Sequence, residues 1–274
     1  MLMEGKKGIV LGIANKKSIA FGIANACREQ GAQMAITFLN ERFEQKLAPI
    51  ADELGCDGRF YPCDVSKPEE IKALRASLEK DFGKIDFIVH SIAFAPKEGL
   101  EGRFSDISKE SFNIAMDISV FSLIEVAKEL KPILSDNASI LTLTYLGGVQ
   151  YIPNYNLMGV AKAALEMTVK YLAEDFGKDG IRVNAISAGP IKTLAAAGID
   201  DFSFMLKWNA AHAPLKQNVT IHQVGNSGMY LLSDLSSGVT GEIHYVDCGY
   251  NIMGMPATVE DENGKAKLAW NGES

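Results

Sequence analysis

The sequence predicts an α/β fold, a doubly wound sheet of seven parallel strands in a single domain that spans residues 1–274. Short apolar runs alternate with longer segments of helical period, and this alternation requires crossover helices on both faces of a parallel sheet. No repeat, low-complexity stretch or linker rich in glycine, proline and serine divides the chain. With 47% hydrophobic and 22% charged residues, its composition is that of a globular protein with a sizeable core.

In the first half of the chain, small and capping residues bound the expected elements. Gly31 and Gly55 stop the first two helices. Ser66 precedes Pro68 and forms a Ser-x-x-Glu pattern with Glu69, so we expect it to cap the third helix. The expected elements are strands at residues 8–11, 34–38, 59–65 and 85–92, and helices at residues 19–30 and 41–54 and after residue 66.

In the second half, a stripe of Leu165, Val169, Leu172 and Phe176 indicates an amphipathic helix. Residues 189–218 interrupt the alternation, and we expect them to form a substrate lid, because insertions at the carboxyl ends of strands border ligand sites. A polar tail follows from residue 260. The expected elements are strands at residues 139–145, 181–187 and 243–246, and helices at residues 108–134, which Ser108 caps weakly, and 155–177.

Charge and composition exclude several classes of function. An excess of 34 acidic over 27 basic side chains argues against a nucleic-acid-binding protein. No apolar stretch reaches the ~18 residues of a membrane span, and no signal-like run precedes the first strand. The four cysteines form no Cys-x-x-Cys pair, and no two of the four histidines lie four residues apart, so no metal site is expected. These observations predict a cytoplasmic protein.

The turn after the first strand contains small residues that let a phosphate approach the backbone. Gly12, Ala14, Ser18, Ala20 and Gly22 replace the usual Gly-x-Gly-x-x-Gly pattern, and by themselves they fit an ordinary turn equally well. Because they link the first strand to the first helix, we expect a dinucleotide pyrophosphate at the helix N-terminus of a Rossmann-like sheet.

The ends of the next strands bear on the choice of cofactor. Leu39 stands where an acidic residue takes ribose hydroxyls or a basic residue takes a 2′-phosphate. With no basic residue at Leu39 or Asn40, NAD(H) is favoured over NADP(H), although Arg42 leaves the second choice open. Asp64 is either an adenine ligand or an ordinary aspartate at a strand end, and residues 90–93 end the fourth strand beside the expected nicotinamide ribose.

Tyr155 and Lys162 lie seven residues apart on one expected helix. Two helical turns return nearly the same face about 10 Å further along, so a phenol and an ammonium can face one cleft. A cation near a phenol favours its ionised form, and a phenol can donate a hydrogen bond to a developing oxyanion. The ordinary alternative is an edge tyrosine and a solvated lysine. Because the pair follows the fifth strand of a cofactor sheet, we expect it to be catalytic.

From Gly8 to about Met255 the chain resembles the short-chain dehydrogenase/reductase superfamily and, within it, most closely the bacterial enoyl-[acyl-carrier-protein] reductases of type II fatty-acid synthesis. Ordinary members place the tyrosine and lysine four residues apart and have a serine on the fifth strand. This chain has Tyr-x₆-Lys, and Tyr145 takes the serine position. The stretches that carry the resemblance are residues 90–96, 143–147, 153–156, 182–190 and 193–195, together with Lys162.

The resemblance implies that NADH reduces a trans-2-enoyl thioester carried by acyl carrier protein, the last reductive step of each elongation cycle. It also implies a homotetramer and a cofactor-bound site that phenolic inhibitors such as triclosan target. Tyr155 would bond the thioester carbonyl, Lys162 the nicotinamide ribose, and Tyr145 would line the substrate side. The implied cofactor contacts are Gly12, Ser18, Ile19, Leu39, Asp64, Val65, Ile92, Ile191, Thr193, Leu194 and Ala195, and the implied acyl-chain contacts are Ala95, Met158, Ile199, Phe202 and Met205.

Two other functions share this fold. A carbonyl reductase or alcohol dehydrogenase would have a serine on strand five and Tyr-x₃-Lys, so Tyr145 and Gly159 count against it. A cofactor-binding sensor without catalysis would not need the set of Tyr145, Tyr155 and Lys162.

The lid also leaves two questions open. An acidic carrier protein would dock on cations, and around this acidic and aromatic segment only Lys192, Lys207 and Lys216 could serve. Phe202 and Met205 could equally be core residues at helical spacing.

Overall fold

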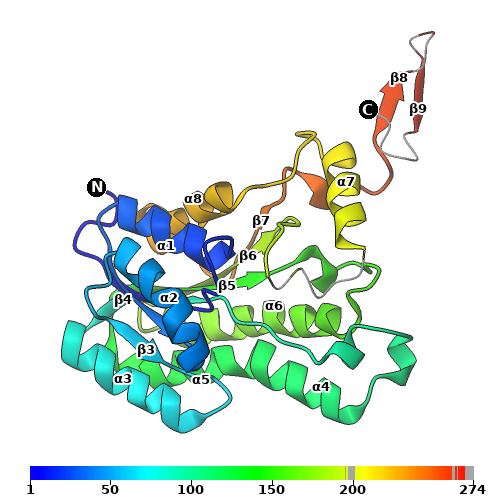
Figure 1. Ribbon diagram of the computed structural model, residues 1–274. Helices are drawn as coiled ribbons and strands as arrows, with labels where there is room; N and C mark the ends of the chain where they lie inside the picture. The colour runs from blue at the N-terminus through cyan, green and yellow to red at the C-terminus, as the bar shows by residue number, and fades with distance from the viewer. Residues whose placement is uncertain (195, 197–200, 261–262, 264, 269–274) are drawn as a thin grey trace.

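Seven parallel strands form one sheet in the order β3-β2-β1-β4-β5-β6-β7, which confirms the predicted fold class (Figure 1). The computed structural model describes residues 1–194, 196, 201–260, 263 and 265–268. Chain order reverses between β1 and β4, which is where doubly wound sheets bind ligands. The strands are β1 (Lys7–Leu11), β2 (Gln33–Phe38), β3 (Phe60–Pro62), β4 (Ile85–His90), β5 (Leu134–Thr144), β6 (Arg182–Ala188) and β7 (Ile243–Val246).

Helices cover both faces of the sheet, and each face has its own apolar core (Figure 1). Successive residues of β4 alternate between the two: Ile88 belongs to the core under α3, α5 and α6, and Val89 to the core under α1, α2 and α8. Both side chains are fully buried, as expected for the most apolar strand. The helices are α1 (Ile19–Glu29), α2 (Glu41–Glu53), α3 (Pro68–Phe82), α4 (Lys109–Met116), α5 (Ser122–Leu130), α6 (Asn156–Gly177), α7 (Phe202–His212) and α8 (Ile221–Leu232).

The long helix expected over residues 108–134 is interrupted. A π-helical turn at Asp117–Phe121 separates α4 from α5, and β5 already begins at Leu134. Ser119, inside the π turn, explains the break: its hydroxyl accepts from the Phe94 N–H at 3.0 Å and donates to the Phe94 carbonyl at 2.9 Å. The π turn therefore fastens the loop after β4, in keeping with the frequent use of such turns at functional sites. Ser108 does cap α4, by accepting from the Ser111 N–H.

The capping prediction at Ser66 is wrong. The N-cap of α3 is Lys67, and the Ser66 hydroxyl instead donates to the Asp64 carboxylate at 2.7 Å. Glu70, rather than Glu69, reaches back and accepts from the Asp64 N–H at 2.7 Å. The sequence pattern fits a capping box, but the carboxylate that ends β3 competes successfully for the serine.

Two elements near the C-terminus were not expected. Helix α8 packs against α1, and a hairpin of β8 (Thr258–Glu260) and β9 (Ala266–Leu268) projects beyond α7 (Figure 1). Part of the polar tail thus forms a strand pair. Helix α7 lies in the inserted segment after β6, and residues 195 and 197–200 of that segment lie outside the described part of the chain. None of the helices in the described ranges is both long and apolar enough to span a bilayer.

Candidate active site

The predicted phosphate turn lies at the carboxyl end of β1, beside the end of β4. Gly12 has a positive φ of 96°, and a Cβ there would overlap the Ser91 carbonyl oxygen, so only glycine fits. Ser18 precedes α1 and is buried; its hydroxyl accepts from the N–H groups of Ala14 at 3.0 Å and Asn15 at 3.1 Å. The hydroxyl proton remains available as a donor, next to the N–H groups of Ile19 and Ala20, which precede the first N–H that bonds back to the Ser18 carbonyl, that of Phe21.

The ends of β2 to β4 place the other predicted cofactor residues along the same edge. Leu39 is half exposed directly after β2, and Asn40 caps α2 by accepting from the Phe43 N–H at 3.3 Å. Val65 is buried after β3, and Ile92 is partly buried after β4. A helix N-terminus and apolar side chains at the point where strand order reverses fit a dinucleotide, with polar atoms for phosphates and apolar faces for the bases.

Asp64 also lies on this edge of the sheet, and its neighbours stabilise the ionised carboxylate. Partial burial raises its pKa, but hydrogen bonds from Ser66 and the ammonium of Lys67 at 3.6 Å hold the pKa below its usual value. Asp64 lies just after β3, and its Oδ1 already accepts hydrogen bonds from Ser66. Only the other carboxylate oxygen could accept a further hydrogen bond from an adenine amino group.

Lys162 is buried in α6 with its ammonium under the end of β5. Its Nζ donates to the Leu143 carbonyl at 2.7 Å, and only 6% of the residue is exposed. Burial lowers the pKa of Lys162 to about 8, while the carboxylate of Glu166 opposes that shift. The alternative of a solvated lysine is therefore excluded.

The rings of Tyr145 and Tyr155 pack edge to face just after the end of β5. Their ring centroids are 5.0 Å apart at an interplanar angle of 72°. Gly147 allows this contact, because a Cβ at that position would overlap the Tyr155 ring. The spacing thus brings Tyr155 and Lys162 to the end of β5, and Tyr145 lies beside Tyr155.

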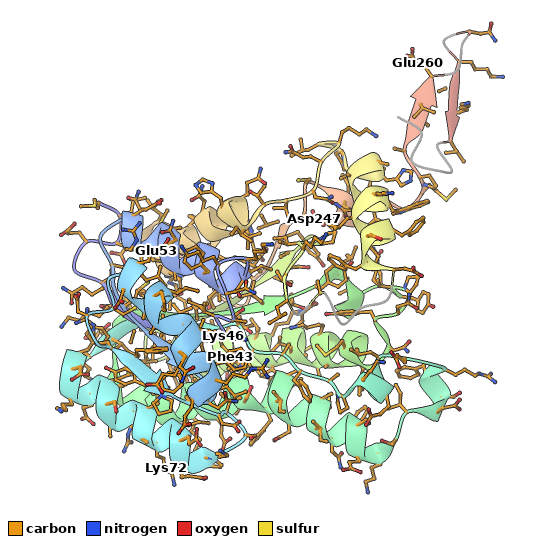
Figure 2. The ribbon with its side chains drawn as sticks, viewed as in Figure 1. Phe43, Lys46, Glu53, Lys72, Asp247 and Glu260 are labelled. Atoms are coloured by element: carbon orange, nitrogen blue, oxygen red, sulfur yellow. The ribbon has the colours of Figure 1, made fainter. Side chains whose placement is uncertain are left out.

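Tyr155 is a neutral phenol. Burial, together with the neighbouring Tyr145 and Glu166, raises the pKa of Tyr155, and Lys162 does not offset it. Burial likewise raises the pKa of Tyr145 to about 12, with contributions from Tyr250 and Asp247. Both phenols are neutral at physiological pH and can act as hydrogen-bond donors. Figure 2 shows Asp247 where β7 ends, next to α7.

His90, which ends β4, points into the core instead of the cleft. It is fully buried, its Nε2 lies 2.9 Å from the Ser122 hydroxyl, and burial followed by the charge of Lys162 lowers its pKa to about 3. The Ser122 hydroxyl donates to the Ile118 carbonyl at 2.6 Å, which assigns the proton to Nε2 of a neutral His90. The His90 ring next to Lys162 is therefore neutral and adds no charge to its surroundings.

The predicted acyl-chain residues that the structure describes come from α6, α7 and the loop after β4. Met158 is buried in α6, with its sulfur 3.9 Å from the Ser119 hydroxyl, and Ala95 packs on the same core. Phe202 and Met205, in α7, are only partly buried, so they are not interior core residues of the isolated chain. Ile199 lies outside the described residues.

The segment after β6 holds the remaining cofactor predictions. Ile191 packs against the core on the α1 side, and Thr193 accepts from the Ala196 N–H at 3.2 Å. Leu194 is 55% exposed. Ala195 lies outside the described residues, so its predicted contact is not placed.

Three buried polar residues around this site were missed by the sequence interpretation: Ser119, Thr144 and Glu166. Each acts through a partner more than 20 residues away in the chain. The one local signal was the position of Glu166, a charged residue on the buried stripe of α6 four residues after Lys162.

Comparison with known proteins identifies the family. A family model described as enoyl-(acyl carrier protein) reductase matches residues 12–251. The chain is 55% identical over 256 residues to enoyl-[acyl-carrier-protein] reductase [NADH] 1 of Rhizobium meliloti, covering 93% of this chain and 94% of that protein.

Solved structures agree with this match. An enoyl-(acyl-carrier-protein) reductase of Anaplasma phagocytophilum in complex with NAD is 47% identical, with a TM-score of 0.89 over 93% of this chain and 95% of that chain. The Bacillus cereus enoyl-acyl carrier protein reductase with NADP+ and an indole naphthyridinone is also 47% identical, with a TM-score of 0.90 over 93% and 99% of the two chains. The chain belongs to the enoyl-(acyl carrier protein) reductase family.

Proposed function

We propose that this chain is an NADH-dependent enoyl-[acyl-carrier-protein] reductase, which reduces the Cα–Cβ double bond of a trans-2-enoyl thioester in fatty-acid elongation. The observation that carries the proposal is the set of Tyr145, Tyr155 and Lys162 around the end of β5. The similarity to reductases of this name over 93% of the chain supports it. A tyrosine in place of the fifth-strand serine disfavours a carbonyl reductase, and a buried catalytic set would be superfluous in a sensor.

The chemistry places negative charge on the thioester oxygen. The carbonyl makes Cβ electrophilic, and bound NADH supplies the hydride that adds there. The neutral phenol of Tyr155 donates a hydrogen bond to the resulting enolate oxygen, and a donor placed in advance contributes about 3–4 kcal/mol to such a step. Lys162 holds the nicotinamide ribose through its ammonium and adds positive potential. Tyr145 packs against Tyr155 and lines the substrate side, and protonation at Cα completes the saturated chain.

The other site residues take the roles that the family pattern assigns. Gly12, Ser18 and Ile19 meet the phosphates and ribose, and Ile191, Thr193, Leu194 and Ala195 meet the pyrophosphate and carboxamide. Leu39, Asp64, Val65 and Ile92 line the rest of the dinucleotide. The segment 189–218, with α7, covers an acyl slot lined by Ala95, Met158, Ile199, Phe202 and Met205. Carrier protein docks near Lys192, Lys207 and Lys216.

One comparison tests the reaction. NADH consumption is followed with crotonyl thioester and, in parallel, with a panel of ketones and aldehydes. We expect oxidation of NADH with the enoyl thioester only, and formation of butyryl thioester. Turnover of ketones with no enoyl reduction would favour the carbonyl reductase, and binding of NADH without any turnover would favour the sensor.

The preference for NADH has a local cause. Asn40 is engaged in capping α2, and neither it nor Leu39 offers a cation to a 2′-phosphate. We expect kcat/KM with NADH to exceed that with NADPH by about tenfold or more, equivalent to ~1.4 kcal/mol. The NADP+ complex of the Bacillus cereus relative makes this measurement necessary. Equal efficiency with both cofactors would assign the 2′-phosphate to Arg42, which is exposed on α2.

The active form is a homo-oligomer, a tetramer by family resemblance. The outer faces of α4 to α6 support this proposal, because they expose Phe112, Phe121, Val160, Met167 and Tyr171. An apolar hollow of about 600 Å³ lies over the π turn between α4 and α5. A second hollow, of about 480 Å³, lies between the turn at Gly147 and the start of α6.

A further inference from the structure

Glu166 is a buried carboxylic acid that the reaction, as described so far, does not use. It lies on α6 one turn after Lys162 and is only 7% exposed. The Thr144 hydroxyl donates to its Oε1 at 2.7 Å. A Cβ on Gly148 would come within 2.8 Å of the same oxygen. The carboxyl group therefore sits where α6, the last residue of β5 and the turn after it meet.

Burying a carboxyl group costs free energy unless it is hydrogen-bonded and serves a charge nearby. Thr144 supplies the hydrogen bond, and it directly precedes Tyr145 in the chain. Lys162 is the neighbouring buried cation, and its ammonium donates a hydrogen bond to the carbonyl of Leu143 in β5, the strand that also contains Thr144. One acidic side chain is thus coupled to both halves of the catalytic set.

We propose that Glu166 is a positioning residue of this enzyme: through Thr144 it fixes the end of β5 that carries Tyr145, and its negative charge keeps Lys162 protonated. The inference rests on the proposed function for its kinetic part. The charge relation to Lys162 stands on the structure of the free chain and can be tested by cofactor binding alone.

The other groups around Lys162 and Glu166 do not supply the negative charge that keeps Lys162 protonated. Lys162 faces His90 of β4, which is neutral, and the Leu143 carbonyl of β5. Glu166 faces Lys170 on its own helix, Tyr155 at the helix start and Tyr245 of β7. Burial raises the pKa of Tyr245, with contributions from Glu166, Asp247 and Glu242, so this phenol also stays neutral. Burial raises the pKa of Glu166, and Thr144, Lys170 and Lys162 oppose that shift.

Two variants separate the two roles. Glu166→Gln keeps an oxygen acceptor for Thr144 but removes the charge. Thr144→Val keeps the charge but removes the hydroxyl that holds it. The dissociation constant of NADH is measured by fluorescence from about pH 6 to about pH 9, and kcat and KM for crotonyl thioester are measured over the same range. Glu174→Gln, the same substitution at an exposed site on α6, is the control.

The two variants are expected to affect different measurements. Without the carboxylate, the ammonium of Lys162 loses its proton at lower pH. Glu166→Gln therefore binds NADH about threefold or more weakly than the wild type on the alkaline side, as a shift of about half a pKa unit would produce, and similarly at about pH 6. Thr144→Val lowers kcat about tenfold with little change in the pH dependence of NADH binding, because it loosens Tyr145.

The contrary results are equally defined. A Glu166→Gln protein with wild-type NADH binding at every pH overturns the charge role, and a Thr144→Val protein with wild-type kcat overturns the tether. If Glu166→Gln does not fold, Glu166→Asp replaces it: its shorter carboxylate retains the charge and gives up the bond to Thr144, so wild-type kcat in that variant counts against the tether. Absence of enoyl reduction in the wild type would refute the proposed function, whereas the NADH titrations would still test the charge role.

Discussion

At the residue scale, the proposed reaction depends on the neutral phenol of Tyr155. Its pKa is raised by burial, so it can stabilise an oxyanion only by donating its proton in a hydrogen bond. Tyr155→Phe keeps the ring that packs on Tyr145 and Gly147 but removes the donor. We expect kcat to fall about 10²–10³-fold with little change in NADH affinity. Near-normal kcat would move the oxyanion role to Tyr145 or to the cofactor ribose.

Lys162 gives a second prediction, and its sign follows from burial. Desolvation lowers its pKa from the ordinary 10.5 to about 8, so the ammonium is present below that pH and is lost as the pH rises through it. NADH affinity should therefore decline above about pH 8. Lys162→Ala should abolish turnover and weaken NADH binding about tenfold or more, the range for a lost charged hydrogen bond. Lys178→Ala, at an exposed site after α6, is the control.

Unchanged NADH titrations in Lys162→Ala would show that the ammonium does not hold the ribose. A loss of affinity of equal size in Lys178→Ala would show that only the general positive field of the helix matters.

The placement of Tyr155 and Lys162, the proposed catalytic pair, at the start of one helix could be predicted from the sequence because helical spacing alone relates the two residues. Glu166, Thr144 and Ser119 could not, because their partners lie on other elements, and the bonds join residues 22 to 25 positions apart. The raised pKa of Tyr155 could not be predicted for the same reason. Its burial depends on Tyr145 and on the turn at Gly147, which only the folded chain brings together.

At the element scale, α8 escaped prediction because its sequence is a weak helix former on its own. It contains Gly225 and Gly228, each of which costs helix stability. The fold needs these glycines, since a Cβ on Gly225 would overlap the Gly22 carbonyl of α1, and one on Gly228 would meet Ile23. A local signal was present: Thr220 and Gln223 form a capping box at the start of α8.

The C-terminal end of α8 leads to a prediction for stability. Arg182 of β6 is buried, and its guanidinium donates to the carbonyls of Leu231 at 2.9 Å and Ser233 at 3.1 Å, and to the Ser236 hydroxyl at 2.8 Å. A cation is favourable at the negative end of a helix. Arg182→Leu removes these charge-assisted hydrogen bonds from a buried site, although Ser139 and Ser236 still donate to the Leu231 carbonyl and Ser236 to the Ser233 carbonyl, so we expect a loss of about 1.5–3 kcal/mol.

Urea unfolding at fixed protein concentration measures this loss. Arg28→Leu, which removes an exposed arginine from α1, should stay within about 0.5 kcal/mol of the wild type. A similar, small effect of both substitutions would mean that water replaces Arg182 at the end of α8.

At the scale of the whole molecule, the sheet followed from the sequence because each strand is a separate apolar run and parallel order requires helices between runs. The broken helix before β5 did not, since Ser119 must be paired with Phe94 before a π turn is favoured over a straight helix. Likewise, the β8–β9 hairpin contains few apolar residues and has no periodic signal long enough to distinguish it from a polar tail.

The surface of the whole molecule also has an apolar face that supports the proposed self-association. Val160, Met167 and Tyr171 recur on α6 at intervals of seven and four residues, so they share one face, and Met167 and Tyr171 are 50% and 72% exposed. An apolar helix face of this kind is usually buried against a partner, and a second copy of the chain brings the same face with two-fold symmetry.

Light scattering after gel filtration should therefore give a mass above that of one chain for the wild type. Tyr171→Glu should lower that mass, because a buried interface does not accept an unpaired charge. Leu2→Glu, at an exposed site near the N-terminus, should leave it unchanged. An unchanged oligomer in Tyr171→Glu would place the contact on another face.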